Sequence, residues 1–425
     1  MSNKNFKPNE FGLAVEDSLE EAVELLRDLI AFPSTRGYEG PVSRHLAKVM
    51  APLVDQAEPI PIPDSFQDDP EYRWRLQDFT YSATENLRLS LGSGQAGKRL
   101  LLNAHMDVVP PSRGQDHPWD AEVRDGIVLG RGACDDKGQI AVIYLVLKTL
   151  RALGLKPATR LVVDLVVEEE NGGNGTLWMV RNPVPVEAAI VMEPTRMQVC
   201  PAVRGAVWFT LTLEGRAGHS GAAGSTKSAL KLAVKAMELI EDYHDQLLAE
   251  SRGHNRLFDA FENPMPVTFG QLEAGDWPAT APSRAVLRGV FGFLPNKRVA
   301  DIQDGLHDVL ANCGDPWLRD HFTLSFDMLN SDGNEIPEDH ELVEGLGRAL
   351  RDNDESVDLL ALTASCDAFF YNNTLQIPTV VFGAGDLWKH AHSNDEQIAV
   401  SDIRRTEMVL LSFISEWCGL VKEEA

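Results

Sequence analysis

The sequence predicts an α/β fold, in which a mainly parallel sheet is flanked by helices and a smaller α+β domain is inserted into the larger one. The chain has 425 residues, more than one hydrophobic core usually organises, so two domains are expected. Up to about residue 200, short β-rich runs alternate with helical segments, a pattern typical of parallel sheets covered on both faces. Beyond that point the order becomes βαββαβ, which forms a self-contained two-layer unit.

The N-terminal half supplies most of the parallel sheet. A helix is expected to begin near Ser18, where Ser18-x-x-Glu21 forms a capping box, and to end before Pro33. Residues 55–84 are rich in Pro, Asp and Gln and are expected to be irregular. The elements expected after them are strands at 86–91 and 99–103, a helix at 138–153, and strands at 159–167 and 188–192.

The C-terminal half begins with the inserted unit. Its expected elements are a strand at 207–213, a helix at 228–243, strands at 266–272 and 285–293, a helix at 299–311 and a strand at 322–326. The elements expected to return to the first domain are a helix at 340–351, a strand at 377–382 and a helix at 402–417. We therefore predict a first domain made of residues 1–202 and 330–425, with residues 203–329 inserted as a second domain.

The chain is strongly acidic, with 64 Asp and Glu against 39 Lys and Arg and a formal net charge of −25. This charge would repel nucleic acids and anionic membrane surfaces, so neither is expected as a partner. No apolar run reaches the roughly 20 residues of a membrane-spanning helix. Such acidity is typical of a solvated surface, and the alternative is that some of the carboxylates gather around cations.

The cysteines and the N-terminus favour a cytoplasmic protein. An odd number of cysteines without a CxxC pair suits a reducing compartment better than a disulfide framework, and it disfavours a cysteine-based zinc site. The five are Cys134, Cys200, Cys313, Cys366 and Cys418. The first ten residues are polar and lack the basic-then-apolar layout of a secretory signal.

Two polar motifs border the predicted elements. His105-x-Asp107 follows the strand at 99–103, and in extended chain both side chains point to the same face. The imidazole can bind a metal while the carboxylate orients the ring, although a structural hydrogen-bonded pair is the more ordinary interpretation of this motif alone. The glycine-rich segment 130–138 places Asp135 and Asp136 just before a helix, where an N-cap is the alternative.

Further acidic residues and a histidine come where other strands end. Residues 168–170 are three successive glutamates after an apolar strand, and their mutual repulsion is tolerable when cations neutralise it. An exposed acidic loop is the alternative. Glu193 closes another apolar strand, and His392 follows a glycine-containing turn, with His390 close enough to take its place.

These residues share one position in the predicted fold, the ends of sheet strands. Open α/β sheets bind ligands at that edge, so we expect the side chains to meet there. Two imidazoles and three carboxylates suit Zn²⁺, Co²⁺ or Mn²⁺ better than Mg²⁺ or Ca²⁺, which prefer oxygen ligands. The sequence thus predicts one or two divalent ions, Zn²⁺ being favoured, held by His105, Glu193, His392, one of Asp135 and Asp136, and a glutamate of residues 168–170.

The motifs HxD, GRGxxDxKG, EExGG, EPT and HxxxE, in this order, resemble those of the M20 family of metallopeptidases and amidohydrolases. The chain looks most like the branch of acetylornithine deacetylase and succinyl-diaminopimelate desuccinylase. The resemblance covers nearly the whole chain and implies a zinc-peptidase-like catalytic domain, with residues 203–329 as a lid or dimerisation domain. The implied reaction is hydrolysis of a C–N amide bond in a small N-acyl amino acid-like substrate.

The resemblance also implies how the site is divided. One ion would lie between His105 and Glu193 and the other between Glu170 and His392, with Asp135 bridging them. A cis peptide bond between Asp135 and Asp136 is implied as well.

Three further residues receive catalytic roles from the resemblance. Asp107 would orient a ligand histidine, and Glu169 would be the general base that takes a proton from water and passes it to the departing nitrogen. Residues 215–220 are similar to the family's GxxGH[AS], whose histidine, here His219, stabilises the oxyanion in a partner subunit. This implies a homodimer formed through the lid. A turn histidine with no catalytic task is the alternative for His219.

The substrate is less defined than the reaction. Residues 275–282 lack the asparagine that many family members use, with an arginine, to clamp the substrate carboxylate. A dipeptidase or carboxypeptidase is therefore a second hypothesis, and hydrolytic deamination of an aromatic amine stacked on Trp277 is a third. A non-catalytic binding protein is the last, and the presence of Glu169 argues against it.

Overall fold

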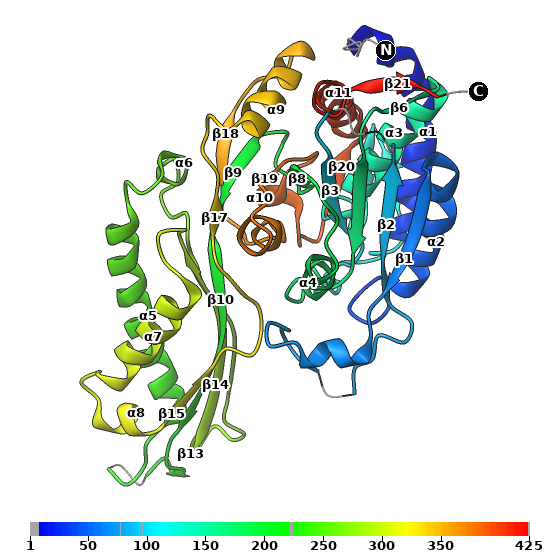
Figure 1. Ribbon diagram of the computed structural model, residues 1–425. Coiled ribbons are helices and arrows are strands. Elements are labelled where there is room, and N and C mark those ends of the chain that lie inside the picture. Colours follow the sequence, from blue (N-terminus) through cyan, green and yellow to red (C-terminus); the bar gives the residue numbers. More distant parts are fainter. Residues whose placement is uncertain (1–7, 77, 93, 95–96, 222–223, 424–425) are drawn as a thin grey trace.

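The computed structural model describes residues 8–76, 78–92, 94, 97–221 and 224–423, which form two units that each combine a sheet with helices (Figure 1). The first and last described residues, Pro8 and Glu423, both lie in the larger unit (Figure 1). One hydrophobic core joins residues between Ala22 and Val203 with residues between Leu342 and Leu420, and a second core is built almost entirely from residues 202–318. The predicted α/β fold with an inserted α+β unit is confirmed.

The larger unit is organised around a nine-stranded sheet with the order β1-β2-β7-β3-β8-β19-β9-β17, in which β18 also pairs with β9. The strands are β1 (Gln56–Pro61), β2 (Glu85–Leu91), β3 (Leu100–His105), β7 (Leu161–Val166), β8 (Ala188–Val191), β9 (Val199–Val203), β17 (Asn334–Glu335), β18 (Leu359–Leu362) and β19 (Thr379–Val381). The four central strands, β7, β3, β8 and β19, run parallel, whereas β1, β2 and β17 pair antiparallel with their neighbours. The carboxyl ends of the central strands therefore meet at one edge.

Helices cover both faces of this sheet, with α1 and α2 on one side and α4 on the other (Figure 1). The α1, α3 and α11 helices pack against one another, and α9 packs against α11. The helices of this unit are α1 (Pro8–Ile30), α2 (Gly40–Met50), α3 (Lys137–Ala152), α4 (Asn174–Arg181), α9 (Glu341–Asp352), α10 (Leu387–His390) and α11 (Val400–Trp417). Every strand residue of β3, β7 and β8 is buried, as expected for strands covered on both faces.

Two expectations for the N-terminal half were wrong. Helix α1 begins at Pro8 rather than near Ser18, since the helix-favouring residues before Ser18 continue the same helix and Ser18 lies buried within it. The segment 55–84 is not wholly irregular, because β1 pairs antiparallel with β2 along its full length. Its prolines are tolerated because β1 is the edge strand of the sheet.

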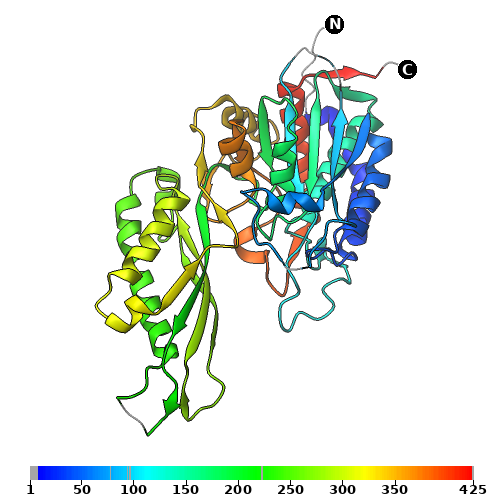
Figure 2. The same ribbon diagram turned by 60° about the horizontal axis from the view of Figure 1, so that its bottom comes forward.

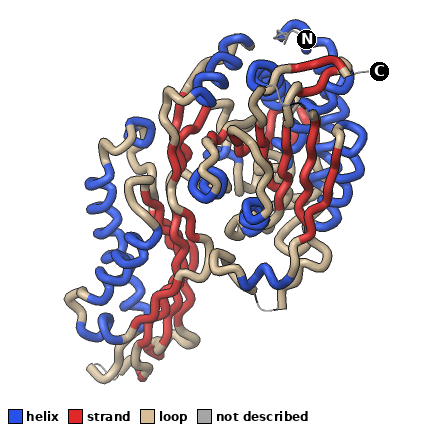
Figure 3. Tube along the Cα trace, in the orientation of Figure 1, coloured by secondary structure: helices blue, strands red, loops and turns tan. Residues whose placement is uncertain are grey.

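The smaller unit is a two-layer structure of helices on a five-stranded antiparallel sheet with the order β12-β14-β10-β15, in which β16 also pairs with β10. Its elements are β10 (Gly205–Glu214), α5 (Ala229–Ser251), α6 (Arg256–Asp259), β12 (Val267–Ala274), β14 (Arg284–Phe293), α7 (Val299–Ala311), α8 (Pro316–Asp320), β15 (Phe322–Ser325) and β16 (Asn330–Ser331). Helices α5 and α7 cover one face, and the sheet lies between them and the larger unit (Figures 2 and 3).

Short elements complete the chain. They are β4 (Glu122–Arg124), β5 (Ile127–Leu129), β6 (Leu155–Pro157), β11 (Gly218–His219), β13 (Thr280–Ala281), β20 (Gln397–Ala399), β21 (Leu420–Lys422), the 3-10 turns Ala51–Leu53 and Asp64–Asp68, and the π turn Phe370–Thr374. Among the described helices, none combines the length and the apolar character needed to cross a lipid bilayer.

Candidate metal centre

The five predicted ligands meet at the carboxyl edge of the central strands. His105 ends β3, and Glu170 and Glu193 follow β7 and β8. Two overlapping groups have possible ligand atoms within 4.8 Å of one another; one contains His105, Asp135, Asp136 and Glu193, and the other contains Asp135, Glu170 and His392. Asp135 belongs to both groups, which matches the division that the resemblance implied.

The Asp135 carboxylate lies between the two imidazoles. Its Oδ1 is 2.9 Å from His105 Nε2, and its Oδ2 is 3.3 Å from His392 Nε2. The same His392 nitrogen is 3.0 Å from Glu170 Oε1. The two oxygens of the Asp135 carboxylate therefore face different histidines.

The two ring nitrogens of His105 face different acceptors. Its Nδ1 lies 3.0 Å from the backbone oxygen of Asp107, and a carbonyl oxygen only accepts, so this nitrogen carries the proton. Its Nε2 lies 2.9 Å from Asp135 Oδ1, which also only accepts, so this nitrogen carries a proton as well, and a metal bound there would replace that proton. The Asp107 carboxylate is 3.5 Å from the same Nδ1, so the backbone of Asp107 holds the ring more closely than its side chain does.

The Asp107 carboxylate also holds the acidic turn, a task that the sequence did not predict. Its Oδ1 accepts the backbone N–H of Glu169 and its Oδ2 that of Glu170, both at 3.1 Å. A single side chain thus connects the loop after β3 with the turn after β7. The two glutamates are presented side by side as a result.

Glu396, the last residue of HxxxE, fixes the loop that carries Asp135. Its Oε1 accepts the backbone N–H groups of Cys134 and Asp135 at 3.1 and 3.0 Å. Its Oε2 accepts from the buried Arg131 guanidinium at 2.6 Å. The expected cis peptide between Asp135 and Asp136 is present. Neither Arg131 nor Glu396 is among the residues predicted from the sequence, although their places in two of the motifs are a usable signal.

Asp136, which is not among the ligands that the resemblance implied, also lies at the site. It is fully buried, and its Oδ2 accepts the backbone N–H of His105 at 3.0 Å. Its Oδ1 has no hydrogen-bond partner among the described residues. Asp136 therefore holds the strand that ends in His105, and it joins the first group of possible ligands.

The charges in this cluster fit divalent cations. Burial, together with Asp135 and Asp136, holds the pKa of Glu193 well above its ordinary value. In the part of the chain that the structure describes, the Glu193 carboxylate has no hydrogen bond or ion pair, although its residue is only 4% exposed. A buried carboxylate without a partner is costly, and a cation among these donors would remove the cost. The residues present therefore fit the metal ions that the sequence predicted.

Glu169 lies on the turn beside the predicted ligands. Burial and the neighbouring Asp367 hold the pKa of Glu169 well above its ordinary value. Asp367 is itself buried, with its pKa raised to about 6, and its Oδ2 accepts the Thr176 hydroxyl at 2.5 Å. A carboxylate with a raised pKa is suited to accept and return a proton near neutral pH.

Two predicted histidines lie apart from this cluster. His219 belongs to β11, which pairs with β13 at the far end of the smaller unit (Figure 1). Its side chain is exposed, and Gly221 donates a backbone hydrogen bond to its Nδ1 at 3.1 Å. His390 lies near Gln397 and belongs to neither group of possible ligands, so the alternative of His390 as a ligand loses support.

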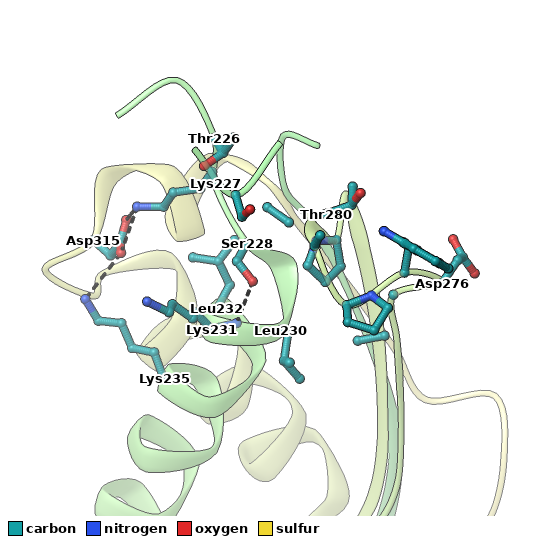
Figure 4. A pocket seen from close by; sticks show the side chains of 18 residues that line it. Thr226, Lys227, Ser228, Leu230, Lys231, Leu232, Lys235, Asp276, Thr280 and Asp315 are labelled. Atoms are coloured by element: carbon teal, nitrogen blue, oxygen red, sulfur yellow. Dashed lines mark hydrogen bonds and ion pairs between the residues drawn. The ribbon is translucent and has the colours of Figure 1, made fainter. Parts of the chain in front are cut away.

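A hollow lies beside β11 and β13, away from the predicted ligands (Figure 4). It measures about 950 Å³ and is lined by residues such as Thr280 and Lys231. Lys227 and Lys235 lie 3.4 Å from Asp315 on its wall (Figure 4). None of the five predicted ligands lines it, so the chemistry cannot be assigned to this hollow.

The chain was compared with known proteins. The model of Peptidase family M20/M25/M40 matches residues 101–416. An acetylornithine deacetylase of Proteus mirabilis is 27% identical over 403 residues, covering 93% of this chain and 96% of the relative. The same enzyme of Shigella sonnei is 27% identical over 410 residues, covering 95% and 100%.

Solved structures share the fold at low identity. Human carnosine dipeptidase 1 superposes with a TM-score of 0.76 at 16% identity, over 97% of this chain and 99% of that one. A di-peptidase of Saccharomyces cerevisiae gives a TM-score of 0.78 at 13% identity, over 98% and 99%. The family match, the near full-length relatives and the gathered ligands agree, and the chain belongs to Peptidase family M20/M25/M40, as a metal-dependent enzyme that hydrolyses amide bonds.

Proposed function

We propose that this enzyme removes the acyl group from a small N-acyl amino acid, using two divalent ions that share Asp135. The observation that carries the proposal is the position of the Asp135 carboxylate, with one oxygen 2.9 Å from His105 and the other 3.3 Å from His392. The relatives described as acetylornithine deacetylase, similar over more than nine-tenths of the chain, support an N-acyl amino acid as substrate.

The ligands we propose are His105 and Glu193 for one ion, Glu170 and His392 for the other, and Asp135 for both. Ions held there would polarise the scissile carbonyl and make water a better nucleophile at neutral pH. Glu169 would take the proton of the attacking water and give it to the leaving nitrogen. Its backbone N–H bond to Asp107 supports this role, because it fixes the base beside the ligands without using its carboxylate.

Zinc is the ion we propose, with Co²⁺ or Mn²⁺ able to replace it. Each proposed site combines one imidazole nitrogen with carboxylate oxygens, a mixed set that suits these metals better than Mg²⁺ or Ca²⁺. We also propose a cytoplasmic location, which the five free and buried cysteines support.

Residues 203–329 are proposed as a lid that also forms a homodimer. His219 would then complete the site of the partner subunit and stabilise the oxyanion there. The exposed apolar side chains of this unit support an interface. Leu230 and Val234, one turn apart on α5, are 40% and 48% exposed, and Trp277 is 70% exposed.

A substrate panel tests the proposal. N-acetyl and N-succinyl amino acids and dipeptides would be assayed with protein reconstituted with Zn²⁺, Co²⁺ or Mn²⁺. We expect the fastest release of free amine from an N-acyl amino acid. Faster cleavage of dipeptides would favour a dipeptidase or carboxypeptidase, and release of ammonia without an acid product would indicate deamination.

The variant Glu169→Gln tests the mechanism. We expect metal content to persist while kcat falls by roughly 10²- to 10⁴-fold, the usual contribution of a general base. Glu170→Gln is the matched control on the same turn, and it should lose bound metal as well as activity. Unchanged turnover in Glu169→Gln would remove this residue from the mechanism.

A further inference from the structure

The three glutamates after β7 do not share one environment. Glu169 and Glu170, the proposed base and a proposed ligand, are half-buried, whereas Glu168 is fully buried. The sequence predicted that cations would neutralise the crowded acids of this turn. For Glu168 the cation is Arg36, whose Nε lies 2.5 Å from Glu168 Oε1.

A second partner completes the surroundings of Glu168. The Tyr81 hydroxyl donates to Glu168 Oε2, and the Tyr72 hydroxyl lies 2.9 Å from that of Tyr81. The Arg36 guanidinium also donates to the backbone oxygen of Trp74 at 2.8 Å. Both oxygens of the Glu168 carboxylate are therefore bound by side chains that come from outside the turn.

The backbone at Glu168 has a conformation that needs such support. Its φ is +58°, in the left-handed region, and its carbonyl oxygen accepts the N–H of Gly173 at 2.8 Å. On the other side, Asp107 accepts the N–H groups of Glu169 and Glu170. The turn is thus held from two directions, by Asp107 at its backbone and by Arg36 and Tyr81 through Glu168.

We propose that Arg36 and Tyr81 are positioning residues that act through Glu168 to set the places of Glu169 and Glu170. This inference rests on the proposed function, because it assumes that Glu169 is the base and Glu170 a ligand. Tyr81 and Trp74 belong to residues 62–84, the segment between β1 and β2, and this segment contacts the smaller unit. Trp74 N donates to Asp327 O at 2.9 Å, and the Trp74 and Trp208 rings lie 5.8 Å apart.

The chain offers a matched control for the loss of a buried ion pair. Arg88 of β2 binds Asp164 of β7 through two hydrogen bonds of 2.7 Å, and the two residues lie opposite each other in the sheet. Asp164 and Glu168 are both fully buried acids bound by an arginine, and they lie four positions apart. Only Glu168 belongs to the turn that carries the base.

The experiment compares Glu168→Gln with Asp164→Asn, with Tyr81→Phe as a milder change that removes a single hydroxyl. Apo-protein would be titrated with Co²⁺, whose visible absorption reports ligand geometry, and kcat and KM would be measured separately. We expect Glu168→Gln to lower kcat about 10- to 100-fold with little change in KM, to alter the Co²⁺ spectrum and to weaken the second Co²⁺ equivalent. Tyr81→Phe should change both readouts in the same direction by less.

Asp164→Asn should lose thermal stability but keep the wild-type kcat and spectrum. Wild-type kcat and Co²⁺ spectrum in Glu168→Gln would overturn the inference, and so would equal losses in Asp164→Asn. Failure of the proposed function is distinguishable. If Glu169→Gln retained full activity, Glu169 would not be the base, whereas an inactive Glu169→Gln beside an unaffected Glu168→Gln would refute the positioning role alone.

Discussion

Glu407 should make the stability of the fold depend on pH between about 4.5 and 8. This residue of α11 is fully buried, and neither of its carboxylate oxygens has a hydrogen-bond partner in the described chain. Burial raises the pKa of Glu407 from 4.5 to about 8, and the approach of Thr149 and Arg404 offsets this only in part. The folded protein therefore holds a proton that the unfolded chain has released.

The sign follows from proton linkage. Below pH 4.5 both states carry the proton, and Glu407 adds no pH dependence there. As pH rises from 4.5, the unfolded chain ionises first, so the folded state loses stability until pH 8, above which the loss is constant. A difference of about 3.5 pH units, at about 1.4 kcal/mol each, amounts to about 5 kcal/mol.

Glu407→Gln removes the titrating group and keeps the side-chain shape. We expect the Tm of the variant, measured by calorimetry from pH 4.5 to 9, to gain several degrees over the wild type as pH rises. Glu20→Gln, an exposed change on α1, controls for the loss of one negative charge. Parallel pH profiles for the wild type and Glu407→Gln would refute the reasoning, since they would mean that Glu407 does not change its protonation in this window.

The remaining predictions concern the metal centre. Removal of metal by a chelator should abolish activity and lower Tm, and Zn²⁺ should restore both. Glu170, with Asp135, raises the pKa of His392 to about 12, so a metal that binds His392 must displace a proton. The affinity for metal should therefore rise with pH, and calorimetry in buffers of different ionisation enthalpy should detect the released proton. Mixing inactive His219→Ala with inactive Glu169→Gln should restore about a quarter of the wild-type activity if each site uses the partner's histidine, because half of the dimers are then mixed and each mixed dimer has one complete site. No recovery would place the whole site in one subunit. Trp74→Ala should lower kcat and leave Tm near the wild-type value if the segment between β1 and β2 supports Arg36. An unchanged kcat would contradict this.

The arrangement of the proposed ligands could be predicted because it depends on strand ends. His105, Glu170 and Glu193 each follow an apolar run, and the ends of parallel strands meet at one edge whatever their distance along the chain. Helix α7 was predicted at its observed bounds, Val299–Ala311, for a similar local reason, since its apolar positions recur with helical spacing.

Residues that act through long-range pairing could not be predicted in this way. Arg36 is 132 positions from Glu168, and Arg131 is 265 positions from Glu396. The sequence around each of these residues does not indicate which residue it pairs with, because the pairing depends on how the loops fold over the sheet edge. The strand β1 was missed for the same reason, since its prolines argue against a strand until its edge position is known.

The buried acids of this protein are neutralised in different ways, and the difference supports the proposed metal centre. Asp164, Glu168 and Glu396 each face an arginine, so their charges are neutralised within the chain. Glu407 is a single acid without a hydrogen bond, and a proton is enough to neutralise it. Glu193 has no arginine partner among the described residues, and a proton on Glu193 alone would leave the negative charge of its neighbour Asp135, whose pKa is lowered, in place. A divalent cation neutralises several such groups at once, which is why we place the ions there rather than at any other buried acid.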